Sequence, residues 1–270
     1  METRRINHNN ASGRSASLPL KAACVSDVGS VRENNEDNFY LGLEDGVFIV
    51  SDGMGGHQSG EIASRIVVEI LPQILHNRLK EMQARGEMTD LKALLQAGAL
   101  ELNNLVNEKA QSEPGMRGMG ATLAMAWISD SRGTAYLANV GDSRVYYYRN
   151  RHLYQLTRDH SLIALLLQQG EIAPEEVRDH PARGRLFRFI GMEGEALAGV
   201  HRIRLSPGEQ LLLCSDGLTD VLDDAFICGL LDSHADALSA CQALVEAADL
   251  AGSKDNITAM VIEWEGSAGE

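Results

Sequence analysis

The sequence predicts an α+β fold, and two observations carry this prediction. Strand-like segments come in blocks, interrupted by two long helical segments in the first half of the chain and by one helix near its end. Several neighbouring strands are separated only by short turns, at 130–133, 149–151 and 206–208. Strands joined by such turns run antiparallel. Blocks of strands and helices, in place of strict alternation, are typical of the α+β class.

Helices and strands follow one another along the chain. Helical periodicity runs from Ile62 to Leu75, with Pro72 expected to kink or split the helix. A second helix is expected after Asp90 as its N-cap, and a third over about 235–251. Apolar or alternating runs between turn residues predict strands, at 22–26, 38–43, 47–50, 121–128, 134–139, 144–149, 153–155, 201–205, 210–214 and 257–263.

Composition indicates an acidic globular protein. The chain has 270 residues, 24 Lys+Arg against 38 Asp+Glu, and a formal net charge of −14, a balance that disfavours nucleic acid as a partner. Residues 1–19 are expected to form a flexible polar N-terminal extension, and residues 20–265 a single domain. No apolar run reaches the roughly 18 residues of a membrane span. The four cysteines form no Cys-x-x-Cys pair, which with the missing signal peptide predicts a reducing, cytoplasmic location.

Acidic residues lie at the ends of several predicted strands. An apolar run is followed by Ser-Asp-Gly at Asp52 and again at Asp216, while Asp142 follows another strand and Asp255 precedes the last. A single Asp-Gly pair is most often a turn. Several carboxylates at the ends of buried strands repel one another unless cations or protons neutralise them. An all-oxygen set without a His or Cys cluster favours Mg²⁺ or Mn²⁺ over Zn²⁺.

Two neighbouring segments can contribute to the same site. Arg32 lies four residues before the pair Glu36 and Asp37. If this loop enters the site, the guanidinium suits a phosphoryl group and the acids add metal-facing oxygens; alone, it would be a solvated loop with a surface ion pair. Gly53 can offer its carbonyl to a metal held by the preceding aspartate. His57 is either a proton donor or a histidine at a helix start.

These residues resemble the bacterial form of the PPM family, the type 2C Ser/Thr protein phosphatases. The resemblance covers nearly all of the chain after residue 20, and it implies a four-layer α-β-β-α sandwich of two antiparallel sheets packed face to face with helices outside. The matching motifs occur in the family's order, at Ser26–Gly29, Arg32–Asp37, Asp52–His57, Gly118–Thr122, Asn139–Arg144, Thr157–Ser161, Ser215–Asp220 and Asp255–Thr258.

The resemblance implies a site for two core Mn²⁺ or Mg²⁺ ions in a cleft at one end of the sandwich. Asp52 would bridge the two ions. Asp216 and Asp255 would complete the first, and Glu36 with the Gly53 carbonyl would complete the second.

The remaining matches imply further roles. Asp142 and Asp220 match the acids that bind a third, weaker metal ion in bacterial members. Asp37 would orient a metal-bound water, and Arg32 would grip the substrate phosphate. The implied reaction is hydrolysis of phosphoserine and phosphothreonine on proteins, in which water activated between two ions attacks phosphorus in line without a phosphoenzyme.

The chain also departs from the family pattern. Met54 stands where eukaryotic members have a histidine, so the general acid is unassigned. Ala121 replaces the first threonine of the usual Gly-Thr-Thr, and we expect this change to be tolerated as packing. The segment 162–191 matches the family's flap by position and is expected to govern substrate choice. This segment contains Arg183, Arg185 and Arg188.

The resemblance also implies partners for this chain, and three other functions compete with it. Phosphorylated proteins are the expected substrates, a bacterial receptor-like Ser/Thr kinase is the expected opponent, and the chain is expected to be a monomer. A metal-dependent phosphoesterase of other specificity would share the ions and differ in the flap. A binding module would normally have lost a metal acid, and a nuclease would need the basic track that the composition lacks.

Overall fold

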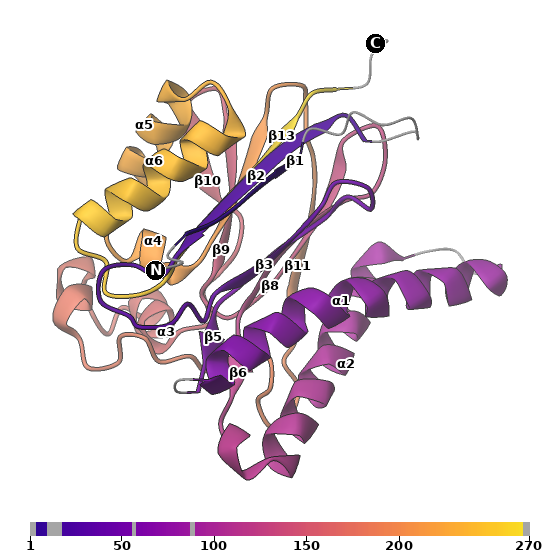
Figure 1. Cartoon of the computed structure of the whole chain (residues 1–270), viewed down its shortest axis with the longest axis horizontal. Helices are drawn as coiled ribbons and strands as arrows, with labels where there is room; N and C mark the ends of the chain where they lie inside the picture. Colours follow the sequence, from indigo (N-terminus) through magenta and orange to yellow (C-terminus); the bar gives the residue numbers. More distant parts are fainter. Residues whose placement is uncertain (1–3, 10–17, 56–57, 87–89, 267–270) are drawn as a thin grey trace.

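The chain folds into four layers. Two antiparallel sheets lie face to face, with α1 (Gln58–Ala84) and α2 (Leu91–Ser112) outside one and α5 (Asp224–Ser233) and α6 (Ala237–Leu250) outside the other (Figure 1). The α+β class and the α-β-β-α sandwich are therefore confirmed. The computed structural model describes four stretches of the chain, residues 4–9, 18–55, 58–86 and 90–266.

Each sheet has a continuous antiparallel strand order. The sheet beneath α5 and α6 is ordered β1 (Arg4–Asn9), β2 (Leu20–Asp27), β13 (Ile257–Trp264), β12 (Gln210–Cys214), β9 (Arg144–Arg149), β10 (His152–Gln155). The sheet beneath α1 and α2 is ordered β11 (Gly199–Arg204), β8 (Thr134–Val140), β7 (Leu123–Ile128), β4 (Val47–Ser51), β3 (Asn38–Gly42).

Shorter elements gather at one end of the sandwich. Strands β5 (Gly53–Met54) and β6 (Gly120–Ala121) pair with each other just beyond β4 and β7. Helix α4 (Asp216–Thr219) begins where β12 ends, and α3 (Leu162–Gln169) lies nearby at the same end (Figure 1). The 3₁₀ turns Pro114–Met116 and Pro174–Asp179 complete the described elements.

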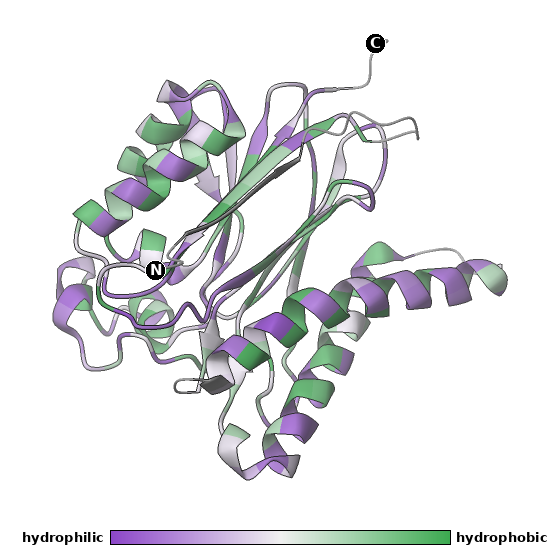
Figure 2. Ribbon diagram, viewed as in Figure 1, coloured by the Kyte–Doolittle hydropathy of each residue, from purple (hydrophilic) through white to green (hydrophobic). Residues whose placement is uncertain are grey.

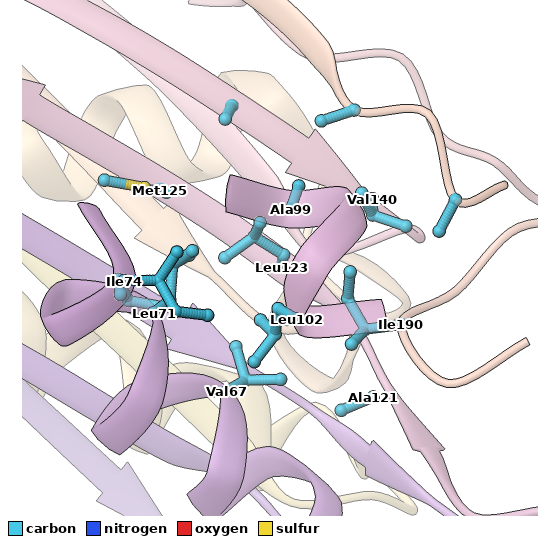
Figure 3. Close-up of a cluster of buried hydrophobic side chains, with 14 of the residues drawn as sticks. Val67, Leu71, Ile74, Ala99, Leu102, Ala121, Leu123, Met125, Val140 and Ile190 are labelled. Carbon is cyan, nitrogen blue, oxygen red and sulfur yellow. The ribbon is translucent and has the colours of Figure 1, made fainter. Parts of the chain in front are cut away.

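Apolar side chains fill the three interfaces between the layers. Leu71 of α1 and Leu102 of α2 meet Met125 of β7 in the cluster between the helix pair and its sheet (Figure 3). Phe48 is buried between the two sheets, and Val245 of α6 is buried against the outer face of the other sheet. The four long helices alternate hydrophobic and hydrophilic residues along their length (Figure 2), as expected for helices that cover a sheet with one face.

Several details differ from the sequence-based expectations. Helix α1 continues through Pro72 without splitting, because the neighbouring Leu71 and Leu75 are buried against the sheet. The strand expected at 121–128 is interrupted at Thr122 and becomes β6 and β7. Helices α3, α4 and α5 were not predicted. Strand β1 lies within the segment expected to be a flexible extension and pairs with β2; the domain boundary at residue 20 stays a prediction.

The cysteines are unpaired thiols. Cys24, Cys214 and Cys241 are buried, whereas Cys228 is half-buried near the carbonyl of Arg151. Among the described residues, we find no helix with both the length and the apolar character needed to cross a lipid bilayer.

Candidate metal centre

The candidate metal centre is a cavity of about 550 Å³ at the end of the sandwich that carries β5 and α4. Its acidic lining comes from separate loops, and Arg32 and Gly53 also line it. Asp37 is buried, whereas Asp220 is exposed beside the cavity at the C-cap of α4. His57 lies outside the described residues. The acidic lining residues are Glu36, Asp52, Asp142, Asp216 and Asp255.

Asp52 is held in the gap between β4 and β5. Its backbone N–H donates to Thr122 Oγ1 at 2.9 Å, and the Thr122 N–H donates to the Asp52 carbonyl at 2.8 Å. The next residue, Gly53, donates its N–H to the Glu36 carbonyl at 3.2 Å. A Cβ at Gly53 would lie 2.1 Å from the carbonyl oxygen of Gly60, so only glycine permits this approach to α1.

Asp216 follows β12 and Asp255 precedes β13, and these two strands are neighbours in the sheet. Asp216 is the first residue of α4, and Asp255 lies two residues before β13. A Cβ at Gly217 would lie 2.0 Å from the carbonyl oxygen of Asn256, so glycine allows the two segments to touch. The Asp-Gly pairs in the sequence therefore serve close backbone approach as well as turning.

The loop that carries Arg32 and Glu36 is fastened by the side chain of Asn256. Asn256 Oδ1 accepts from the Glu36 N–H at 2.8 Å, and its Nδ2 donates to the carbonyls of Val28 at 2.9 Å and Asn34 at 3.0 Å. One buried amide thus fixes three points of this loop.

Asp37 is buried, and only one of its two carboxylate oxygens accepts hydrogen bonds. Its Oδ2 accepts from Ser215 Oγ at 2.7 Å and from Thr258 Oγ1 at 2.6 Å. Its Oδ1 is buried without a hydrogen-bond partner. Burial raises the pKa of Asp37 to about 6 against the opposing effect of the two hydroxyls. Asp37 can therefore gain or lose a proton close to neutral pH.

Three other carboxyl groups of the site also have raised pKa values. Burial raises the pKa of Asp52 well above its usual range, and the charges of Asp37 and Asp216 add to the effect. Burial and the charge of Asp142 do the same to the pKa of Asp216. For Asp142 itself, burial and the charge of Asp159 raise the pKa to about 7. The cluster holds more negative charge than it can keep without cations or protons.

Two arginines pair with acids of this cluster. Arg32 Nη2 lies 2.6 Å from Asp255 Oδ2, and Arg183 Nη2 lies 2.8 Å from Asp220 Oδ2. Within the described part of the chain, no three acidic, His or Cys side chains already converge as a ligand cage. The carboxylates do not form such a cage because they repel one another and because two of them pair with guanidinium groups.

The donor chemistry nevertheless fits hard divalent cations. The Oδ1 atoms of Asp37 and Asp216 are both buried without a hydrogen-bond partner, and such oxygens are rare in folded proteins. The lining offers several carboxylate and carbonyl oxygens and, among the described residues, no His or Cys, and oxygen ligands are those that Mg²⁺ and Mn²⁺ prefer. The residues present can therefore hold such ions.

The flap covers part of the cavity rim. Gly184 and Leu186 line the cavity. Arg188 Nη1 donates to the Leu197 carbonyl at 3.1 Å and lies 3.3 Å from His160 Nε2. Arg185 is exposed, and its carbonyl accepts from the N–H of Leu162 at the start of α3. The segment expected to set substrate choice therefore borders the acidic cluster.

Comparison with known proteins identifies the family. Residues 30–252 match the family model described as Protein phosphatase 2C. This chain is a member of that family. The serine/threonine phosphatase stp of Listeria innocua is 36% identical over 247 residues, which cover 90% of this chain and 96% of stp.

Solved structures agree with this membership. The serine/threonine phosphatase PstP/Ppp of Mycobacterium tuberculosis has a TM-score of 0.79 and 34% identity, over 92% of this chain and 100% of that one. The catalytic domain of a phosphatase PstP in complex with two manganese ions has a TM-score of 0.75 and 31% identity, over 90% of this chain and 97% of that one. The prediction of a metal-dependent bacterial Ser/Thr phosphatase with Mn²⁺ or Mg²⁺ as cofactor is confirmed.

Some residues that shape the site lie within the matching motifs but had no predicted role. These are the polar residues that hold the acidic loops, and each is nearly or fully buried. A hydroxyl or amide beside a strand-end Asp was the only available signal, and it does not show which partner the side chain reaches. The residues are Thr122, Ser143, Ser215, Asn256 and Thr258.

Proposed function

We propose that this chain removes phosphate from phosphoserine and phosphothreonine residues of proteins, in a reaction that needs Mn²⁺ or Mg²⁺. The observation that carries the proposal is that strand-end carboxylates and Arg32 line the same cavity. A strongly acidic cavity can receive a phosphoryl anion only if bound cations reverse its charge.

The proposed ligand roles are those that the family resemblance implies, and the residues concerned all line one cavity. Asp52 would contact both core ions, with Asp216 and Asp255 serving one ion and Glu36 and the Gly53 carbonyl the other. When bound, such ions acidify a water molecule and neutralise phosphoryl oxygens.

The third, weaker ion would lie between two further acids. Asp142 and Asp220 are its proposed ligands. Asp220 pairs through Oδ2 with Arg183 of the flap, so a cation bound at this carboxylate would compete with that arginine.

Arg32 and Asp37 contribute the protein's own chemistry. Arg32 pairs with Asp255 and also approaches the Lys254 carbonyl at 3.3 Å. A guanidinium binds carboxylate and phosphoryl groups with the same forked geometry, so Arg32 can turn from Asp255 to the substrate. Asp37 keeps Oδ1 free of protein donors, and by the family resemblance this carboxylate would orient a metal-bound water.

The wider setting is also part of the proposal. Residues 20–265 would form the phosphatase domain, and it would act as a monomer. Four unpaired cysteines favour the cytoplasm. A receptor-like Ser/Thr kinase would supply the phosphoproteins, and the flap would select among them.

A substrate panel tests this proposal. Metal-stripped protein is given phosphoserine, phosphothreonine and phosphotyrosine peptides and a nucleoside monophosphate, with added Mn²⁺ or Mg²⁺, and released phosphate is measured. The proposal expects release from the first two peptides only. Preference for the nucleotide would replace it with a phosphoesterase of other specificity.

A further inference from the structure

Two hydroxyl side chains meet beside the acidic cluster. Thr122 Oγ1 and Ser143 Oγ lie 2.6 Å apart, and each residue is only 1% exposed. Thr122 also lines the cavity. We infer that Thr122 and Ser143 are positioning residues that hold Asp52 and Asp142 at a fixed separation, an inference that rests on the proposed phosphatase function.

Thr122 grips the backbone of Asp52 from both sides. The Asp52 N–H donates to Thr122 Oγ1 at 2.9 Å, and the Asp52 carbonyl accepts from the Thr122 N–H at 2.8 Å. Ser51 Oγ donates to the Thr122 carbonyl at 2.6 Å. Because both peptide groups of Asp52 bond to one residue, the backbone at Asp52 cannot shift without moving Thr122.

The loop that carries Asp142 closes on the same threonine. Ser143 follows Asp142 directly and shares the hydroxyl contact. On the other side, Gly141 has a φ of +98°, and a Cβ there would lie 2.7 Å from Thr122 Cγ2. The methyl group of Thr122 therefore meets the residue before Asp142, and its hydroxyl meets the residue after it. A shift of either acidic loop is passed to the other through Thr122.

This tether matters because the two carboxylates share one cavity. Like charges at close range repel, so Asp52 and Asp142 would separate if their loops were free. The distance between two ligands sets the distance between the ions that they bind. Loss of an outer partner of a metal ligand typically costs about 10–100-fold in metal affinity or activity.

Four variants separate positioning from simple stability. Thr122→Val removes the hydroxyl and keeps the shape, Thr122→Ser keeps the hydroxyl, and Ser143→Ala removes the other half of the contact. Thr157→Val is the matched control. Thr157 is also buried and its Oγ1 accepts the Val145 N–H at 3.1 Å, but it does not line the cavity.

The measurements are Mn²⁺ binding to the metal-stripped full chain by titration calorimetry, and kcat and KM on a phosphothreonine peptide. Thr122→Val and Ser143→Ala should each weaken Mn²⁺ binding by at least about tenfold and lower kcat with KM within about twofold. Thr122→Ser should stay within about threefold of wild type, and Thr157→Val should bind Mn²⁺ normally. The double variant of Thr122→Val with Ser143→Ala should bind Mn²⁺ no more weakly than Thr122→Val alone, since Thr122→Val already removes the contact that Ser143→Ala removes.

Wild-type Mn²⁺ affinity in Thr122→Val, or an equal loss in Thr157→Val, would overturn the inference. If Thr122→Val fails to fold, Ser143→Ala alone decides by the same criterion. A wild-type protein that binds Mn²⁺ without releasing phosphate would refute the proposed function and leave the binding comparison valid. A wild-type protein that binds no Mn²⁺ would overturn both.

Discussion

Replacing Asp142 by asparagine should stabilise the metal-free protein. Asp142 lines the cavity, and burial raises its pKa from 3.8 to about 7, with the charges of Asp159 and Asp220 adding to the effect. A carboxyl whose pKa is higher in the folded state favours folding only while it is protonated. Its contribution is therefore lost as the pH rises from about 4 towards 7, and asparagine removes that penalty.

The size of the gain follows from the shift. A shift of about three pKa units raises the free energy of unfolding of Asp142→Asn over wild type by about 4 kcal/mol at pH 8. The same linkage gives a difference of about 2 kcal/mol at pH 5. The carboxylate still opens into the cavity, so solvent screening makes these values upper limits. For a chain of this size the gain at pH 8 corresponds to an increase in Tm of up to roughly 10 °C.

Urea unfolding of metal-stripped wild type and Asp142→Asn at pH 8 and pH 5 measures this gain. Asp90→Asn is the control, because an exposed N-cap accepts asparagine with little change in stability. The reasoning is refuted if Asp142→Asn is no more stable than wild type at pH 8, or if its gain is larger at pH 5 than at pH 8.

Three further outcomes are expected. Asp216→Asn should lower phosphate release by at least about 100-fold while circular dichroism shows an intact fold; near-normal turnover would remove Asp216 from the metal site. Arg32→Ala should raise the KM for a phosphopeptide by about tenfold, with a smaller change in kcat; an unchanged KM with a large kcat loss would place Arg32 in transition-state stabilisation. Burial and the charge of Arg188 lower the pKa of His160 to about 4, so wild type should lose stability between pH 6.5 and 4. The urea midpoint of His160→Asn should change less with pH over that range than the midpoint of wild type. If it falls equally steeply, His160 is not the cause of the loss of stability.

The sequence predicts the layers well because its long periodic segments are unambiguous. The N-cap at Asp90 is confirmed, with its side chain accepting from Lys92 and Ala93. The secondary structure of short apolar runs was harder to predict. The runs that form α3 and α5 are eight and ten residues long, and periodicity over so few residues does not separate a helix from a buried strand.

The acids of the site were predicted because they share one local property. Asp52, Asp142, Asp216 and Asp255 each border a buried strand, and the sandwich brings those strand ends together. The pairing of Arg32 with Asp255 had no such signal, because it joins residues 223 positions apart. Contacts of this kind depend on loop conformation, which local composition does not determine.

The most direct test of the central claim is the dependence of turnover on bound metal. Metal-stripped protein is titrated with Mn²⁺ while bound ions are counted and phosphate release from a phosphothreonine peptide is followed. The expected result is no release without ions and release that rises as Mn²⁺ binds. Full turnover in the presence of a strong chelator, or no release from Mn²⁺-loaded protein, would contradict it.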